Sequence, residues 1–348
     1  MKAMGFYNTG GPEVLQEIDV AETFPSKGEI IVRVDFTSVN NLDILMRSGG
    51  TKMNFNLPHI PGTDVSGTVE KIGEGVTGLS EGDRVISSTV YGCGACRQCL
   101  SGNEPLCKSW KVLGMHVWGS YAELVRIPSW MAIKPPKAYS PEELGCMPLS
   151  LSVSWRALKV AAKAREGETA LIFGASGNSG IFSLMLAKAM GLRTIAVTSS
   201  EKKKEALKKA GADHVLILNR QNPRELEKEA SELTGGEGAE IIIDPIGNPI
   251  DSSIAMLAHN GRIVAFGTSS SAESQISIKK FYWKSASLIG VHNASAGELN
   301  DAFAFAEKKG IKPIIHSKLR VDQAEEAHRL FSSSEAFGKI LMEHKWQS

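Results

Sequence analysis

The chain has 348 residues, more than one ordinary hydrophobic core serves, so we expect two domains. Its 39 lysines and arginines against 38 aspartates and glutamates give a net charge of +1, which provides no overall attraction to nucleic acid or to an anionic membrane. The N-terminal residues contain no signal-peptide-like apolar core, and no later run approaches the roughly 20 apolar residues that span a bilayer. We therefore expect a cytoplasmic protein that acts on a small molecule.

The first part of the chain, up to about residue 148, reads as short strands separated by turns. Three runs rich in β-forming residues end at glycine or proline: Glu29–Val34, Val65–Ile72 and Asp83–Ser87. This pattern predicts a compact β domain over residues 1–148. Helical patterns then begin at Pro141 and extend from Ser150 to Ala164, so the domain boundary is expected near residue 149.

Four of the five cysteines lie close together, with the spacing Cys93-x2-Cys96-x2-Cys99-x7-Cys107. Four thiolates this close can surround one tetrahedral zinc ion, and because no coordination position remains open, such a metal would be structural. An iron–sulfur cluster would require a shorter final spacing, and disulfides conflict with a cytosolic setting. The sequence therefore predicts a structural zinc lobe over residues 92–108.

Beyond residue 149 strands and helices alternate, which predicts a parallel sheet covered on both faces. The six expected strands are Thr169–Phe173, Arg193–Thr198, His214–Leu218, Ile241–Asp244, Arg262–Phe266 and Leu288–Val291. We interpret residues 149–292 as a doubly wound domain of the Rossmann type. The last segment, 293–348, is expected to pack back on the first domain.

A glycine-rich loop, with the pattern G-x-x-G-x-x-G, joins the first of these strands to a helix. Glycines let the backbone turn and approach a ligand closely, and the helix N-terminus attracts a pyrophosphate. Such loops also occur in proteins that bind no nucleotide, but the surrounding strands favour a dinucleotide. The candidate cofactor-binding residues of the loop are Gly174, Ser176, Gly177, Asn178, Ser179 and Gly180.

The second strand of this sheet ends in Thr198, Ser199 and Ser200, and Lys203 follows. At this position an NAD enzyme places an acidic residue on the ribose hydroxyl, and here there is none. Hydroxyl groups and a lysine tolerate a 2′-phosphate, which a carboxylate would repel. The sequence therefore predicts NADPH in preference to NADH, although these residues could also be no more than a loop.

Together these features resemble the medium-chain dehydrogenase/reductase superfamily, which includes zinc-type alcohol dehydrogenases and quinone oxidoreductases. The shared stretches are the four-cysteine lobe, Gly119–Glu123, Gly174–Gly180, Ala210–Asp213, Asp244–Gly247, Gly261–Val264 and Phe337–Ile340. The resemblance implies an α/β protein in which a GroES-like catalytic domain and a Rossmann domain hold a nicotinamide in the cleft between them. It adds Gly247, Gly267 and Lys339 to the cofactor-binding candidates, and we expect a homodimer or homotetramer.

Alcohol dehydrogenases of this superfamily also carry a catalytic zinc, held by a Cys, a His–Glu pair and a further Cys or Asp. The corresponding positions here are Asn40, the pair Thr63 and Asp64, and the vicinity of Leu149. Asparagine, threonine and leucine cannot assemble a tight zinc site, so we expect one zinc per chain and not two. These replacements are similar to those of the zinc-free quinone oxidoreductases.

Without a Lewis acid to hold an alkoxide, alcohol oxidation is disfavoured. The predicted function is hydride transfer from NADPH to a quinone or an α,β-unsaturated carbonyl compound, with Asn40 and Thr63 polarising the carbonyl and Asp64 orienting them. These three residues could instead be turn and strand formers without a catalytic role. Two other functions stay open: an alcohol or aldehyde dehydrogenase with an unusual metal or a proton relay through Asp64, and a non-enzymatic NADPH-binding protein.

Overall fold

The chain folds into two units in the computed structural model, which describes residues 1–51, 56–219, 221–333 and 335–346. Met1–Ser152 and Asn293–Ser348 form one unit, here called the β-rich unit, and Val153–His292 forms the other, the parallel-sheet unit. In the part of the chain that the structure describes, no helix combines the length and the apolar character needed to cross a membrane.

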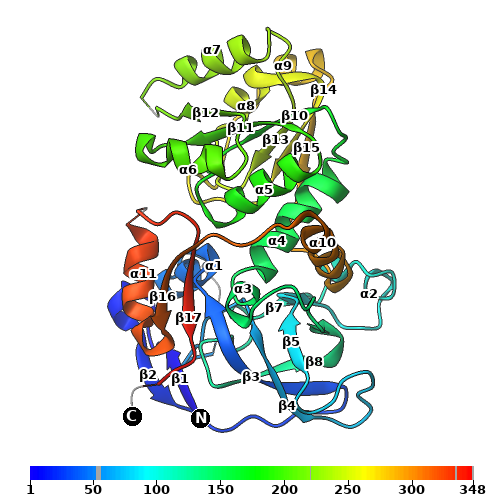
Figure 1. Cartoon of the computed structure of the whole chain (residues 1–348), viewed down its shortest axis with the longest axis vertical. Coiled ribbons are helices and arrows are strands. Elements are labelled where there is room, and N and C mark those ends of the chain that lie inside the picture. The colour runs from blue at the N-terminus through cyan, green and yellow to red at the C-terminus, as the bar shows by residue number, and fades with distance from the viewer. Residues whose placement is uncertain (52–55, 220, 334, 347–348) are drawn as a thin grey trace. The chain divides into compact units, whose positions relative to one another are not determined.

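A seven-stranded sheet is the scaffold of the β-rich unit (Figure 1). Its order is β16 (Ile315–Arg320), β17 (Lys339–Glu343), β3 (Glu29–Ser38), β4 (Ser66–Ile72), β5 (Arg84–Ser87) and β9 (Ala132–Ile133), with β8 (Leu124–Pro128) also paired to β3. β17 pairs antiparallel with β3, and Leu341 lies opposite Ser38. The C-terminal segment therefore completes a sheet that the N-terminal segment begins, and it brings Lys339 to the end of β3.

Shorter elements surround this sheet. The remaining strands are β1 (Lys2–Gly5) paired with β2 (Gln16–Asp19), and β6 (Val90–Tyr91) paired with β7 (Lys111–Val112). The α-helices are α1 (Asn41–Ser48), α2 (Arg97–Leu100), α3 (Pro141–Leu144), α10 (Ala296–Lys309) and α11 (Ala324–Ser332), and 3₁₀ turns lie at Pro12–Val14, Glu104–Leu106, Ser129–Met131 and Val321–Gln323. Helix α4 (Pro148–Trp155) begins in this unit and ends in the other. α10 illustrates the local rules, since Ser295 caps its first turn together with Glu298 and Gly310 ends it at φ 67°.

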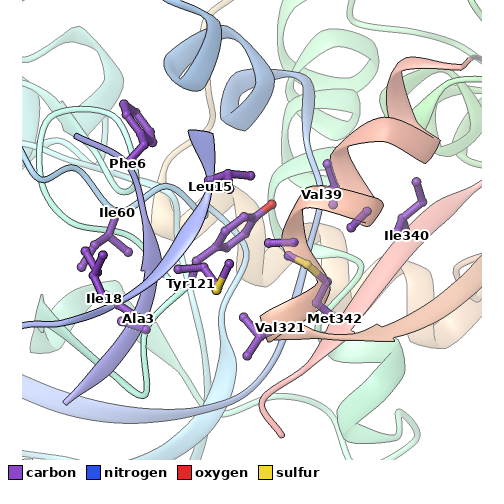
Figure 2. Close-up of a cluster of buried hydrophobic side chains, with 14 residues drawn as sticks. Ala3, Phe6, Leu15, Ile18, Val39, Ile60, Tyr121, Val321, Ile340 and Met342 are labelled. Atoms are coloured by element: carbon purple, nitrogen blue, oxygen red, sulfur yellow. The ribbon is translucent and has the colours of Figure 1, made fainter. Parts of the chain in front are cut away.

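An apolar core joins the two ends of the chain in the β-rich unit. Figure 2 shows side chains from β1 and β2 packed with residues that precede and form β17. Tyr121 lies within this core and carries one of its few polar atoms. A polar atom in such a place is costly unless it is hydrogen-bonded, which makes its partners informative.

The parallel-sheet unit contains six parallel strands. Their order is β12 (His214–Ile217), β11 (Arg193–Thr198), β10 (Thr169–Ile172), β13 (Ala239–Asp244), β14 (Leu257–Ala265) and β15 (Ser287–Gly290). Helices α7 (Pro223–Leu233), α8 (Ile250–Met256) and α9 (Ile278–Trp283) cover one face, and α5 (Asn178–Ala189) and α6 (Lys204–Lys209) the other (Figure 1); a 3₁₀ turn lies at Glu201–Lys203. This is the 3-2-1-4-5-6 order of a Rossmann fold, so the predicted fold class is confirmed.

One predicted helix differs from the structure. A single α-helix was expected from Ser150 to Ala164, but α4 ends at Trp155 and a π-helix follows over Arg156–Ala161. The wider turn shows in the backbone, where the N–H of Ala162 donates to the carbonyl oxygen of Ala157, five residues earlier. The prediction was wrong here because an apolar pattern does not distinguish a π turn from an α turn.

Candidate functional site

The four clustered cysteines come together in the β-rich unit as a potential metal cage. Their Sγ atoms all lie within 4.8 Å of one another. The backbone N–H groups of Cys93 and Ser109 donate to Cys107 Sγ at 3.4 and 3.3 Å. Backbone hydrogen bonds from Ala95 and Cys96 lower the pKa of the Cys93 thiol to about 6. Such bonds favour the thiolate, which is the form that binds a metal.

A glycine packs closely against two of these cysteines. A Cβ atom added at Gly92 would lie 2.4 Å from Cys99 Sγ and 2.9 Å from Cys107 Cβ, so a larger residue there would displace these two cysteines. Within the described ranges, these cysteines are the one group of three or more His, Cys, Asp or Glu ligands close enough to hold a metal ion. Four sulfur donors at this spacing fit zinc binding.

Asn40, Thr63 and Asp64, the candidate catalytic residues, meet in a second polar cluster of the β-rich unit. Asn40 follows β3, and the other two precede β4, which pairs with β3 in an antiparallel manner. Asn40 Nδ2 donates to Thr63 Oγ1 at 3.0 Å and to Asp64 Oδ2 at 2.8 Å. All three residues are buried. The structure therefore joins them in one network, and their role in catalysis stays a prediction.

The carboxylate of Asp64 is surrounded by hydrogen-bond donors. Its Oδ2 accepts from Ser38 Oγ at 2.6 Å, from Asn40 Nδ2 and from Lys339 Nζ at 3.1 Å, and its Oδ1 accepts from the backbone N–H of Leu149 at 2.8 Å. An unpaired carboxylate in this buried place would be costly, and the Lys339 ammonium compensates it. Both oxygens of Asp64 are thus engaged by groups that donate hydrogen bonds.

Lys339 was predicted to contact the cofactor, and the structure places it in this network. Its side chain is 1% exposed. Its Nζ lies 2.8 Å from Asn40 Oδ1 and 3.4 Å from Ser150 Oγ, in addition to its ion pair with Asp64. The contact with Asn40 could not be read from spacing, but a lysine at the head of the apolar run of β17 is a signal that a buried acidic partner exists. Its contact with a cofactor stays a prediction.

A buried chain of polar groups lies next to Asn40 and was missed in the sequence. Asp43 accepts from the backbone N–H groups of Asn40 at 2.8 Å and Gly62 at 3.1 Å. The Tyr121 hydroxyl lies 3.4 Å from Asp43 Oδ2 and 3.0 Å from His328 Nε2. Burial raises the pKa of Asp43 to about 7 and lowers the pKa of His328 to about 3. The Asn40-x-x-Asp43 spacing at the start of α1 is typical of a capping box, and it could have indicated the contact between Asn40 and Asp43.

The glycine loop of the parallel-sheet unit lies where a Rossmann fold binds its cofactor. Gly174 follows β10 with φ 54°, which favours glycine, and Gly177 is the N-cap of α5, so the cap residue itself places no side chain over that helix terminus. A Cβ atom at Gly180 would lie 2.1 Å from the carbonyl oxygen of Gly174. The third glycine therefore lets α5 pack against the loop, as in dinucleotide-binding folds. Ser176, Asn178 and Ser179 occupy the same turn and the first residues of α5.

The predicted hydroxyl groups gather at the carboxyl end of β11. Ser176 Oγ lies 3.2 Å from Thr198 Oγ1, which also accepts from the backbone N–H of Ser200 at 3.3 Å. Ser199 is exposed, and burial lowers the pKa of the partly buried Lys203. The first acidic residue beyond the strand, Glu201, pairs with Lys204 at 3.3 Å.

The turns after β13 and β14 form a close-packed pair. A Cβ atom at Gly267 would lie 1.9 Å from the carbonyl oxygen of Pro245, and one at Gly247 would lie 2.2 Å from that of Ser271. The carboxylate of Asp244 holds the first turn, since it accepts from the backbone N–H groups of Ile246, Gly247 and Asn248 at 3.0, 2.9 and 2.7 Å. Sequence reasoning gave Asp244 no role; the structure shows that it organises this turn.

Comparison with known proteins supports the fold and indicates the family. Residues 26–137 match the family model of the alcohol dehydrogenase GroES-like domain, and residues 180–308 match that of the zinc-binding dehydrogenases. The acryloyl-coenzyme A reductase of Metallosphaera sedula is 30% identical over 93% of this chain and 95% of its own. The quinone oxidoreductase of Rattus norvegicus is 28% identical over 98% and 97%. A crystal structure of an NAD-dependent alcohol dehydrogenase superposes with a TM-score of 0.92 over 99% of this chain and 100% of the other, at 32% identity.

Proposed function

This chain belongs to the medium-chain dehydrogenase/reductase superfamily, and on that premise we propose that it transfers a hydride from NADPH to a quinone or an α,β-unsaturated carbonyl compound without a catalytic metal. Its relatives are oxidoreductases, so the chain is an NAD(P)H-dependent oxidoreductase. Relatives named acryloyl-coenzyme A reductase and quinone oxidoreductase support the narrower substrate class.

The observation that carries the proposal is the pairing of Lys339 with Asp64 beside Asn40. The residues that stand at the metal-ligand positions of the alcohol dehydrogenases face a lysine ammonium 2.8 Å from Asn40 Oδ1 and 3.1 Å from Asp64 Oδ2. An ammonium group cannot bind an alkoxide as a Lewis acid does. An enone or a quinone needs less assistance, because its carbon already accepts hydride and a hydrogen-bond donor can stabilise the resulting enolate.

The cofactor and metal preferences belong to the same proposal. The hydroxyl groups of Thr198, Ser199 and Ser200 and the ammonium of Lys203 favour NADPH, because they tolerate the 2′-phosphate that distinguishes it from NADH. We further propose one zinc per chain, held by Cys93, Cys96, Cys99 and Cys107, with a purely structural role. When bound, NADPH supplies the hydride, and the protein orients it and the substrate.

A homo-oligomer, either a dimer or a tetramer, is also proposed. β15 is the edge strand of its sheet, and Ile278, Tyr282 and Trp283 on the neighbouring α9 are exposed. An unpaired strand edge beside apolar side chains is a surface that proteins commonly cover. Sedimentation equilibrium of the wild-type protein and of a Trp283→Lys variant tests this. A monomeric wild type contradicts it.

The function is tested by NADPH oxidation over a panel of quinones, enones, aldehydes and alcohols, together with zinc quantification. We expect turnover with quinones or enones, tighter binding of NADPH than of NADH, and one zinc per chain. Alcohol oxidation that is lost on chelation and restored by zinc would favour the alcohol dehydrogenase alternative. Cofactor binding without turnover of any carbonyl compound would favour the non-enzymatic one.

A further inference from the structure

The two ends of the Asn40 side-chain amide face opposite charges. Its Oδ1 lies 2.8 Å from the ammonium of Lys339, and its Nδ2 lies 2.8 Å from the carboxylate of Asp64. Exchanging the oxygen and the nitrogen would set N–H against an ammonium and oxygen against a carboxylate, so only one orientation is stable. The Lys339–Asp64 ion pair therefore fixes the direction in which the amide donates.

This direction decides what Thr63 can do. Asn40 Nδ2 has no free lone pair, so at 3.0 Å from Thr63 Oγ1 it must be the donor and the threonine oxygen the acceptor. The hydroxyl hydrogen of Thr63 then has to point elsewhere. Among the residues that the structure describes, the contact with Asn40 Nδ2 is the one hydrogen bond that Thr63 Oγ1 makes. Thr63 is thus a donor whose own proton is unused.

An unused donor at this place is costly. Thr63 is 0% exposed, and a buried hydroxyl proton without an acceptor costs about 1–3 kcal/mol. A valine would fill the same space with a methyl group in place of the hydroxyl and would avoid this cost. Because packing alone does not require a hydroxyl group here, we infer that the group serves a ligand. A ligand that accepts the Thr63 proton has to bring an acceptor oxygen. Because Thr63 is buried, the ligand has to displace the groups that cover it.

We propose that Lys339 is a positioning residue, which acts through Asn40 to keep the Thr63 hydroxyl free to donate a hydrogen bond to the carbonyl oxygen of the substrate. This inference rests on the proposed function. The hydride from NADPH adds to the β-carbon of the enone, which leaves NADP⁺, and the π electrons move onto the carbonyl oxygen as an enolate. The enolate later takes a proton from water at the α-carbon. Thr63 stabilises the charge on oxygen and transfers no proton.

The test compares isosteric variants on whichever carbonyl substrate the wild type reduces. Thr63→Val removes the donor, and Asn40→Asp keeps the shape but accepts the Thr63 proton. Both are expected to lower kcat about 100-fold, the usual effect of losing one donor to an oxyanion, with cofactor affinity unchanged. The thermal midpoint should not fall in Thr63→Val, whereas it should fall in Asn40→Asp, which sets an oxygen against the Asp64 carboxylate. Thr63→Ser, the matched control, keeps the hydroxyl and most of the rate. The double variant Thr63→Val with Asn40→Asp is expected to lower kcat no more than either single substitution does.

Lys339 itself is tested by Lys339→Gln and Lys339→Met. Glutamine can still donate to Asn40 Oδ1 and is expected to retain more of kcat than methionine, which cannot. If Lys339→Met does not fold, the Asn40→Asp and Thr63→Val pair decides the question. Additive effects of that pair, or unchanged kcat in both, overturn the inference while leaving the substrate class intact.

A structural readout separates this inference from the proposed function. Neutron diffraction locates deuterium, and we expect Asn40 Nδ2 to carry deuterium towards Thr63 while the Thr63 deuteron points away from Asn40. A Thr63 deuteron shared with Asn40 overturns the inference whatever reaction the protein performs. Failure of every quinone and enone in the panel overturns the proposed function without changing this result.

Discussion

The β-rich unit contains two polar clusters that differ in the kind of cation they accommodate. The cysteine lobe offers four sulfur atoms within 4.8 Å of one another, and Gly92 packs closely against Cys99 and Cys107. The second cluster, around Asn40 and Asp64, is buried and contains its own cation, the ammonium of Lys339. Soft, anionic donors suit zinc, whereas amide, hydroxyl and a single carboxylate do not. The donor atoms thus distinguish the cysteine lobe, which suits a metal ion, from the second cluster, which suits an internal ion pair.

The largest effect is expected from closing the cysteine cage. Gly92→Ala would place a methyl group 2.4 Å from Cys99 Sγ, so zinc should be lost and the lobe should unfold. Structural zinc contributes about 10–16 kcal/mol in zinc-finger peptides, so a loss of more than about 3 kcal/mol of unfolding free energy is expected here. Zinc content and thermal unfolding measure both effects.

Gly94→Ala is the matched control for that experiment. Gly94 belongs to the same lobe, but nothing lies within 4 Å of an added Cβ atom. Its φ of 74° makes alanine cost about 1 kcal/mol from backbone strain, without loss of metal. Equal zinc loss in the two variants would mean that the cage does not bind a metal as described.

The ion pair of the second cluster should show the next largest effect. Lys339→Met leaves the carboxylate of Asp64 buried without a compensating charge, which is expected to lower the free energy of unfolding by about 3–5 kcal/mol. Lys318→Met is the control, because Lys318 pairs with Glu142 and Glu343 while 38% exposed, and surface pairs contribute about 0–1 kcal/mol. Denaturant unfolding of both variants provides the comparison. Similar losses of unfolding free energy in the two variants would show that the buried ion pair contributes no more than the surface one, which would contradict this prediction.

The two clusters also differ in how well the sequence reveals them. The cysteine lobe lies within 15 residues, so its spacing alone predicts it, and the six apolar strands predict the Rossmann sheet in the same local way. Asn40, Thr63 and Asp64 are recognisable through the family resemblance, because they stand at the catalytic-zinc positions of the alcohol dehydrogenases. Their contact with Lys339 depends on β17 pairing with β3 across 299 residues of sequence. No local pattern carries that information, and the same holds for Tyr121 and His328.

The hydrogen-bonded series Asp43, Tyr121 and His328 is expected to affect how the stability of the protein depends on pH. The folded pKa of His328, about 3, lies below its ordinary 6.5, so the stability contributed by neutral His328 is lost as the pH falls from 6.5 towards 3. The folded pKa of Asp43, about 7, lies above its ordinary 3.8, so its contribution is lost as the pH rises from 3.8 to 7. Between pH 4 and 6.5 the two trends oppose each other.

Removing one partner at a time should reveal each trend. His328→Gln is expected to make the protein less stable, relative to the wild type, as the pH rises from 4 to 7. Asp43→Asn is expected to make it less stable, relative to the wild type, as the pH falls from 6.5 to 4. Each difference should amount to a few kcal/mol, since one unit of pKa shift corresponds to about 1.4 kcal/mol. Urea unfolding across this range measures it. Parallel curves for the two variants and the wild type would show that neither group changes its protonation as described.

The smallest effect is expected from a lysine outside these clusters. Lys203 lies in the 3₁₀ turn that follows β11 and is only partly buried, unlike Lys339, so its removal should leave stability within about 0.5 kcal/mol of the wild type. If it faces the 2′-phosphate, Lys203→Ala weakens NADPH binding by about tenfold, the value of roughly 1.4 kcal/mol for one charge-assisted contact, and leaves NADH unchanged. Lys202→Ala, one residue earlier and exposed, is the control. Fluorescence titration with both cofactors distinguishes the variants, and an equal loss for NADH and NADPH would remove Lys203 from phosphate recognition.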